Sequence, residues 1–384
     1  MQPYRAVLPW FDPILTKKGT ENMNIWGKKL KNPAQNTACP KKAASLRWFS
    51  VLLAVMLLVF SRPAAAEETV SPPDGGFDFG ASSGMQTLTD ENFSLDDMPG
   101  KYTEESENPG RVEKVRYVTS DESGDVKSAM VYLPAGYDDS DKPYNVLYIL
   151  HGASGSPANY LDPSRVTHFQ ALLDNMIGNG DLEPLIVVAA TYYPTESFAR
   201  FQPLAKQVEV TAVFPRELTE DVIPAVESKY RTYAESVDEA GLTASRDHRG
   251  IAGFSLGGVA TWYLFLQKMN TFRWFLPISE ASWDDGEGGT TGIWDSDTSA
   301  RVLYDAVVEQ GYVKDDFRLF VATGTDDEAF DIATTQMVSL LEYADIFKPG
   351  ENTSCSMMSG GTHTLNAVYV YMYHILPALF VGYR

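Results

Sequence analysis

Residues that build disulfide frameworks and metal centres are scarce in this sequence. The chain of 384 residues has only two cysteines, Cys39 and Cys355, and five histidines. Two cysteines cannot provide a disulfide framework, and this absence is compatible with the cytosol or with export from a bacterium. No metal-ligating cluster and no phosphate-binding loop stands out along the chain. The sequence therefore implies no metal and no cofactor.

Positive charge is also scarce, and it is unevenly placed. The chain has 31 Lys and Arg against 51 Asp and Glu, a net charge of −20. Residues 1–66 carry ten Lys or Arg and two acids, whereas residues 67–110 carry one Lys and eleven acids. Without residues 1–66, whose net charge is +8, the net charge becomes −28. Such an acidic surface repels nucleic acid and anionic membranes, which argues against both as partners.

A signal peptide is predicted at residues 41–66. Lys41, Lys42 and Arg47 precede an apolar run of about thirteen residues, 48–60, and three alanines end the segment at Ala66. About thirteen residues are too few to cross a bilayer of ~30 Å as a helix. We therefore expect cleavage near Ala66, a secreted protein and no stable membrane insertion afterwards. A permanent N-terminal anchor is the alternative.

Residues 67–110 have the composition of a disordered linker. The segment is acidic, rich in Gly, Ser, Pro and Asp, and almost without periodic apolar residues. Such a composition buries too little apolar surface to offset the entropy lost on ordering. Phe77, Phe79 and Phe93 are exceptions that could dock on the following domain.

Residues 111–384 read as one α/β domain with a mostly parallel sheet and helices on both faces. Apolar runs typical of buried strands alternate with helical stretches, which is the pattern of such a sheet. The expected strands are 112–118, 126–133, 145–150, 185–190, 249–252, 275–278, 317–323 and 353–358. The expected helices are 165–177, 217–230, 259–269, 299–309 and 329–346.

The stretch Gly-Phe-Ser-Leu-Gly at 253–257 lies between an expected strand and an expected helix. In that context a G-x-S-x-G sequence places Ser255 on a strained turn with its hydroxyl exposed above the sheet. A serine nucleophile needs a histidine base and a carboxylate that orients it, which follow in the chain order Ser, Asp or Glu, His. Of the two later histidines, His363 lies in a Gly-rich loop after a strand, whereas His374 lies in an aromatic helical stretch. We therefore expect His363 to be the base.

Three carboxylates follow the expected strand 317–323 and compete for the role of the acid. They are Asp326, Asp327 and Glu328, and an ordinary turn with a helix N-cap would use the same residue types. The spacing alone does not separate Asp326 from Asp327. An oxyanion hole needs two backbone N–H donors, for which we expect Leu256, after the nucleophile, and Ala153, after an early strand.

Four sequence blocks together resemble the esterase-D-like group of α/β-hydrolases. The group includes feruloyl and acetylxylan esterases of carbohydrate esterase family one, enterochelin esterases and mycolyltransferases. The blocks are Val-Tyr-Leu-Pro-Ala-Gly-Tyr at 131–137, Tyr-Ile-Leu-His-Gly at 148–152, Phe-Pro-Arg-Glu-Leu-Thr-Glu-Asp-Val-Ile-Pro at 214–224 and Gly-Ile-Ala-Gly-Phe-Ser-Leu-Gly-Gly at 250–258.

This resemblance implies the α/β-hydrolase fold over about residues 112–384 and a role for particular residues. Matching Gly-Thr-Asp-Asp at 324–327 to the family's turn selects Asp327 as the triad acid. Matching Gly-Gly-Thr-His at 360–363 to its histidine loop supports His363. The chain departs from the family at Leu256, where methionine is common, and at Tyr160, where the hemicellulose esterases often have tryptophan.

A Gly- and Asp-rich stretch between 279 and 300 contains Trp283 and Trp294. Loops at the carboxyl ends of strands carry specificity in such sheets, so the two rings, with Tyr160, are candidate substrate contacts. A surface excursion without a binding role is the alternative for this stretch.

The resemblance and the expected triad together imply a secreted serine carboxylesterase. Its substrate would be an ester-decorated polysaccharide or a small ester, with feruloyl or acetyl groups removed from plant hemicellulose through an acyl-enzyme. A siderophore esterase or an acyltransferase of the same fold are alternatives, as is a non-catalytic carbohydrate-binding module. No oligomeric state follows from the sequence.

Overall fold

The computed structural model describes residues 93–94, 98–195, 198, 202–284 and 295–382, all of which lie in the unit from Asp74 to Arg384. The predicted signal peptide, residues 67–92 of the predicted linker and Trp294 lie outside the described residues. Within the described ranges, the longest apolar helices fall short of what a membrane crossing requires.

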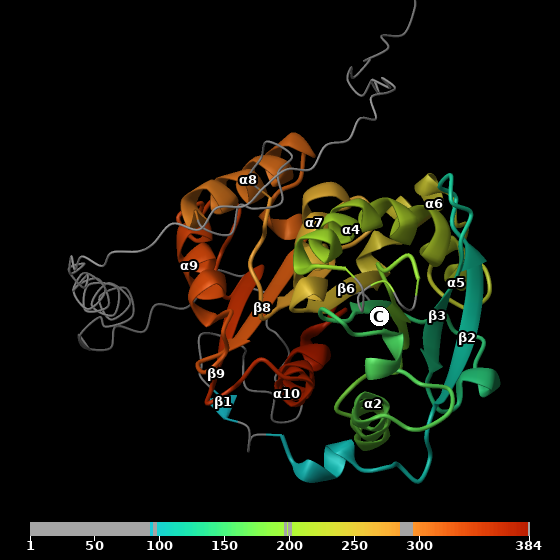
Figure 1. Ribbon diagram of the computed structural model, residues 1–384. Helices are drawn as coiled ribbons and strands as arrows, with labels where there is room; N and C mark the ends of the chain where they lie inside the picture. Colours follow the sequence, from blue (N-terminus) through green and yellow to red (C-terminus); the bar gives the residue numbers. More distant parts are fainter. Residues whose placement is uncertain (1–92, 95–97, 196–197, 199–201, 285–294, 383–384) are drawn as a thin grey trace, which may run out of the picture. The chain divides into compact units, whose positions relative to one another are not determined.

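A nine-stranded sheet organises the described part of the chain (Figure 1). Its order is β1-β9-β8-β7-β6-β4-β5-β3-β2, and only the pairs β2–β3 and β3–β5 are antiparallel. The strands are β1 (Phe93–Ser94), β2 (Arg111–Val118), β3 (Val126–Leu133), β4 (Val146–Leu150), β5 (Ile186–Ala190), β6 (Arg249–Phe254), β7 (Trp274–Ile278), β8 (Arg318–Gly324) and β9 (Thr353–Ser359). The α/β-hydrolase architecture expected from the sequence is therefore confirmed.

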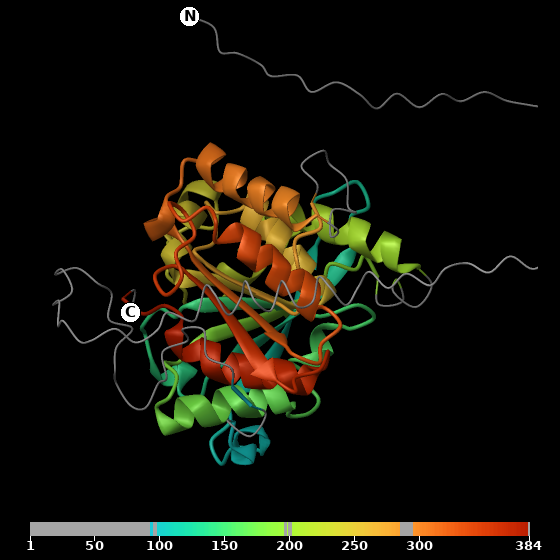
Figure 2. The same cartoon turned by 90° about the vertical axis from the view of Figure 1, so that its left-hand side faces the viewer.

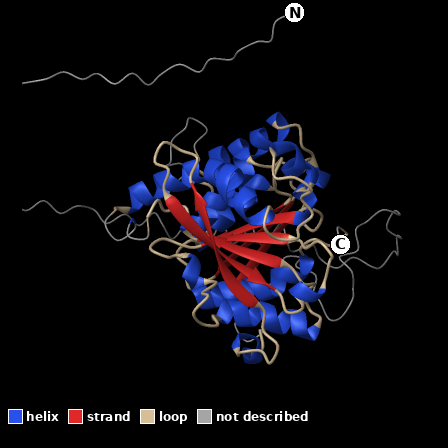
Figure 3. Cartoon of the chain, turned by 90° about the vertical axis from the view of Figure 1, so that its right-hand side faces the viewer, coloured by secondary structure: helices blue, strands red, loops and turns tan. Residues whose placement is uncertain are grey.

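Helices cover both faces of this sheet (Figure 3). On one face α2 (His168–Asn179) and α10 (Leu365–Ile375) lie side by side, as green and red helices in Figure 2. The other face carries α4 (Leu204–Glu217), α5 (Ile223–Glu227), α6 (Glu239–Ala244), α7 (Leu256–Gln267), α8 (Ser296–Glu309) and α9 (Phe330–Leu340).

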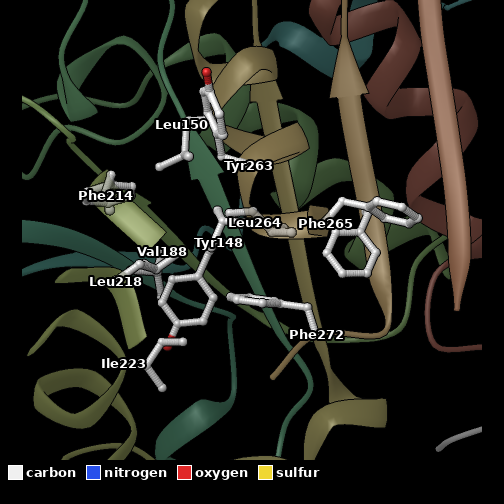
Figure 4. Close-up of a cluster of buried hydrophobic side chains, with 14 of the residues drawn as sticks. Tyr148, Leu150, Val188, Phe214, Leu218, Ile223, Tyr263, Leu264, Phe265 and Phe272 are labelled. Atoms are coloured by element: carbon white, nitrogen blue, oxygen red, sulfur yellow. The ribbon is translucent and has the colours of Figure 1, made fainter. Parts of the chain in front are cut away.

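The central strands are buried along their whole length, as their near-continuous apolar runs predict. Figure 4 shows the cluster between the sheet and α7, where the rings of Tyr148 and Phe272 meet edge to face with centroids 6.1 Å apart. The Tyr148 hydroxyl donates to Glu227, which also forms a buried ion pair with Arg249 at the start of β6 (2.7 Å). This ion pair fixes the start of β6, the strand that ends just before Ser255.

Two expected helices differ from the structure. The helix expected over 329–346 already ends at Leu340, and residues 341–346 form turns. A helix was expected over 217–230, but helical structure already begins at Leu204 and continues through a π turn, Leu218–Val222, into α5. Pro215 lies inside α4 and lacks the N–H that a helix interior uses. The sequence around it therefore resembles the start of a helix and not its interior. The Thr219 hydroxyl donates to the Pro215 carbonyl within the π turn (3.0 Å).

The predicted linker is wrong for its C-terminal part, because the described residues before Arg111 pack on the domain. β1 pairs in parallel with the end of β9, which brings Phe93 opposite Met358. Tyr102 is 6% exposed, and its hydroxyl donates to Asp181 (2.5 Å). Burial of such aromatic groups offsets the entropy lost on ordering this segment, which the overall polar composition does not reveal.

Candidate active site

Ser255 lies on the tight turn between β6 and α7. Its φ of 55° and ψ of −124° are strained for a residue with a side chain. The turn closes because glycines flank it: a Cβ on Gly253 would lie 2.0 Å from the Gly257 carbonyl oxygen, and one on Gly257 would lie 2.4 Å from that of Leu150. Strand, turn and helix therefore pack backbone to backbone, as a nucleophile elbow requires.

The loops that follow β8 and β9 are joined to each other by backbone contacts. The Thr325 N–H donates to the Met358 carbonyl and the Asp326 N–H donates to the Gly361 carbonyl, both at 2.9 Å. These bonds hold Asp327 beside His363, whose Nδ1 lies 2.8 Å from Asp327 Oδ1. The Asp327 side chain is fully buried, whereas that of His363 is 22% exposed. Of the two aspartates that the spacing left open, Asp327 is the one in contact with His363.

The charges of Asp327 and His363 stabilise each other. Burial disfavours the protonated form of His363, but the hydrogen bond and the charge of Asp327 outweigh it and raise the pKa of the imidazole. Burial likewise works against the ionised form of Asp327. The hydrogen bonds from His363 and from the Ala329 N–H prevail, and they lower the pKa of this carboxyl. Asp327 is thus an ionised acceptor that fixes His363 with its Nε2 available to a neighbour.

Ser255 and His363 line one pocket of about 270 Å³. The imidazole lies against the ring of Phe254, the residue before the serine, with centroids 4.6 Å apart. Leu256 and Ala153 border the same pocket, so the structure brings together the predicted nucleophile, base and both oxyanion donors. Leu256 begins α7, where the first N–H groups have no partner within the helix and are free for an oxyanion.

The turn that carries Ala153 is held by residues far along the chain. Ser154 has a φ of 60°, and its N–H donates to the Tyr193 hydroxyl (2.9 Å), which in turn donates to Gln207 of α4 (2.5 Å). His151 contacts the Gly152 carbonyl and the Thr191 hydroxyl through its two ring nitrogens. Burial lowers the pKa of His151 to about 4, so it is a neutral structural residue.

The predicted substrate contacts have three different outcomes. Trp283 lines the pocket, and its Nε1 donates to Glu280 (3.1 Å). Tyr160 does not reach the pocket: its side chain is 0% exposed and packs edge to face on Phe169. The expectation for Tyr160 rested on the family resemblance, in which tryptophan is common at this place, and it is wrong because α2 covers the ring. Trp294 lies outside the described residues.

Several residues of the site were not identified from the sequence, and two of them bear on its chemistry. Glu280 lines the pocket and Tyr193 supports the oxyanion turn, but neither belongs to a motif. Glu280 could have been noticed as an acid two residues beyond an expected strand. The structure also contains no group of three or more potential metal ligands among its described residues.

The family model described as "Putative esterase" matches residues 120–365, a range that includes the elbow and the histidine loop. The chain belongs to this family. Its members share the α/β-hydrolase fold found here, and the chain is accordingly a carboxylic ester hydrolase.

Two curated relatives match part of this chain. Endo-1,4-beta-xylanase Y of Acetivibrio thermocellus is 34% identical over 287 residues, which cover 73% of this chain and 24% of that protein. The endo-1,4-beta-xylanase/feruloyl esterase of Xylanibacter ruminicola is 27% identical over 172 residues, covering 44% of this chain and 21% of that protein. The chain thus spans about a quarter of the length of these curated relatives.

The feruloyl esterase module from Clostridium thermocellum, solved with sinapinate, superposes with a TM-score of 0.66 at 30% identity, covering 78% of this chain and 96% of that module. The CE1 ferulic acid esterase of Anaeromyces mucronatus superposes with a TM-score of 0.57 at 19% identity, over 78% of this chain and 100% of its own, and supports the fold.

The contact between Asp327 and His363 generates a prediction about pH. A histidine base works in its neutral form, so kcat/KM falls as the pH drops through the raised pKa of His363. We expect Asp327→Asn to reduce kcat by about 10³–10⁴-fold and to move this acid limb to lower pH. Asp326→Asn is the matched control, because it removes a neighbouring exposed charge, and we expect less than about a twofold change. Equal losses in the two variants would contradict the assignment.

The support of the oxyanion turn generates a second prediction. Tyr193→Phe removes the acceptor of the Ser154 N–H, so we expect kcat to fall about tenfold with KM within about twofold, less than loss of an oxyanion donor itself. Affinity for a boronic acid that mimics the tetrahedral intermediate should fall in parallel. Tyr132→Phe makes the same chemical change at a buried tyrosine bonded to Asp174, outside the pocket residues. Unchanged boronate affinity in Tyr193→Phe would overturn this role.

Proposed function

We propose that the protein is a secreted serine esterase that removes feruloyl groups from plant cell-wall hemicellulose. The observation that carries the proposal is the single pocket shared by Ser255, His363, Leu256 and Ala153, with Asp327 buried behind the histidine. The similarity to a feruloyl esterase module over almost its whole length supports the choice of acyl group.

The geometry supports a two-step acyl transfer. Ser255 Oγ attacks the ester carbonyl while His363 Nε2 takes its proton, and the N–H groups of Leu256 and Ala153 stabilise the oxyanion. When the tetrahedral intermediate collapses, His363 returns the proton to the leaving alkoxide, and the feruloyl group remains on Ser255. Water then attacks this acyl-enzyme with His363 again as base, which releases ferulate.

The size and lining of the pocket favour one compact aromatic acyl group. Its volume of about 270 Å³ lies just below the ~300–1,000 Å³ usual for small-molecule sites. Trp283 supplies an aromatic wall, and its ring is oriented by the hydrogen bond to Glu280. Aromatic contacts of this kind contribute roughly 0.5–1.5 kcal/mol beyond area burial.

The proposal is tested by hydrolysis of methyl ferulate and p-nitrophenyl acetate. Ser255→Ala should lose about 10⁴–10⁶-fold in kcat on both esters, because the nucleophile is absent. Trp283→Ala should raise KM for methyl ferulate about three- to tenfold and leave KM for the acetate within about twofold. Trp283→Phe, which keeps an aromatic face, is the matched control.

Two results would count against the proposal. Equal rates for the wild type and Ser255→Ala would leave only a binding function. Rapid acetate hydrolysis without any turnover of methyl ferulate would replace feruloyl by acetyl as the acyl group.

Secretion is the other part of the proposal, and residues 41–66 support it through their basic start, apolar run and terminal alanines. We expect N-terminal sequencing of the protein recovered from the culture medium to begin at or near Glu67. Recovery only from the cell interior, with the leader intact, would contradict secretion.

A further inference from the structure

Glu280 is a buried acid at the wall of the pocket that the proposed mechanism does not use. It follows β7 by two residues, is 8% exposed and lines the pocket with Ser255 and His363. A Cβ on Gly258 would lie 3.1 Å from the Glu280 Cβ, so this residue packs against the first turn of α7. Its backbone carbonyl accepts a hydrogen bond from Trp262 Nε1 (3.2 Å), and its position is therefore fixed.

One oxygen of the Glu280 carboxylate holds the neighbouring loop. Oε1 accepts from the Ala281 N–H and from Trp283 Nε1, both at 3.1 Å. Among the described residues Oε2 accepts no hydrogen bond, and it is the oxygen that remains for a bound molecule. Both donors to Oε1 are neutral, so no cation neutralises the carboxylate from that side.

The charges around Glu280 are mostly of the same sign. Glu328 lines the pocket as well, Asp327 lies behind His363, and His363 is the single residue in the described lining that can carry positive charge. Burial raises the pKa of Glu280, the N–H donors and His363 lower it, and Asp327 raises it further. A carboxylate group in this position is weakly screened by water, so its field acts strongly on a bound ester.

We propose that Glu280 is a specificity-determining residue that makes the pocket select neutral, hydroxyl-bearing esters and reject molecules that carry a negative charge beside the scissile bond. The inference rests on the proposed esterase function and deepens it in two ways. A sugar or phenol hydroxyl can donate to Oε2, whereas a ligand carboxylate is repelled. The acid product of hydrolysis is such an anion, so Glu280 also favours its release.

The first arm of the test compares an acid with its neutral isostere as inhibitors. Ferulate and ferulamide have nearly the same shape and differ in charge, and each is measured as an inhibitor of p-nitrophenyl acetate hydrolysis. For the wild type we expect ferulate to bind at least about tenfold more weakly than ferulamide, the effect of one nearby like charge. Glu280→Gln, which keeps an acceptor for Trp283, should reduce this ratio about three- to tenfold.

The second arm uses substrates and is independent of the feruloyl group. 4-Nitrophenyl hydrogen glutarate and 4-nitrophenyl glutaramate also differ by one negative charge, which lies three methylene groups from the ester carbonyl. After subtraction of spontaneous hydrolysis, the ratio of their kcat/KM values should shift in Glu280→Gln in the same direction. Because both members are measured on one preparation, the folded fraction cancels. Asp326→Asn removes an exposed charge nearby and should change either ratio less than about twofold.

The pH dependence gives a further readout. The ratio between charged and neutral members should shrink as the pH falls and Glu280 becomes protonated, beginning at higher pH than for an ordinary carboxyl. Protonation of His363 and of the ligand's own carboxyl also brings the two members together at low pH, so the readout is the difference in this pH dependence between the wild type and Glu280→Gln. Glu328 is exposed and screened.

A change of at least threefold in either ratio for Glu280→Gln supports the proposal. Unchanged ratios in both arms overturn it. Failure to hydrolyse methyl ferulate would overturn the feruloyl assignment alone, because the glutarate pair still tests Glu280.

Discussion

The site depends on the close backbone approach between β6, the Ser255 turn and α7. A side chain at Gly253 or Gly257 would collide with backbone oxygen atoms at 2.0 and 2.4 Å, so the turn exists only because both positions are glycine. The strained φ of Ser255 is a consequence of this packing. Because strand β4 supplies the oxygen against Gly257, the same contact fixes the elbow relative to the loop that carries Ala153.

The parallel sheet brings the remaining groups to this turn. β4, β6, β7, β8 and β9 run in one direction, so the loops with Ala153, Ser255, Glu280, Asp327 and His363 all leave the same edge. The order of the strands reverses between β4 and β6, which is where doubly wound sheets bind ligands. The two donors of the oxyanion hole lie on either side of this crossing point.

Much of the fold could be predicted, because buried strands have a strong sequence signal. All eight expected strands are present within one or two residues of their predicted ends, and Ser255 was recognised from its strand-turn-helix context. His363 could be proposed because it follows a strand in a Gly-rich loop, whereas the position after strand 317–323 left Asp326 and Asp327 open and the family resemblance selected Asp327. The contact between Asp327 and His363, however, is set by bonds between two loops that the sequence does not display.

The features that could not be predicted arise from tertiary contacts. Tyr193 matters through a hydroxyl placed between Ser154 and Gln207, and no local pattern marks it. Glu280 follows β7 as an ordinary loop acid would, and its burial becomes evident only when α7 is packed beside it. The docking of Tyr102 was missed because the composition of its segment resembles that of unfolded chains.

The short strand β1 has a practical consequence for isolating the catalytic domain. It pairs with Met358 and Ser359, the last residues before the loop of His363, and it occupies the outer edge of the sheet. A domain trimmed to begin at Arg111 would leave the backbone groups at the end of β9, at Met358 and Ser359, open to another chain, and exposed edges of this kind promote aggregation. A catalytic domain made for expression should therefore begin upstream of Phe93, although the composition of residues 67–110 suggests a start near Arg111.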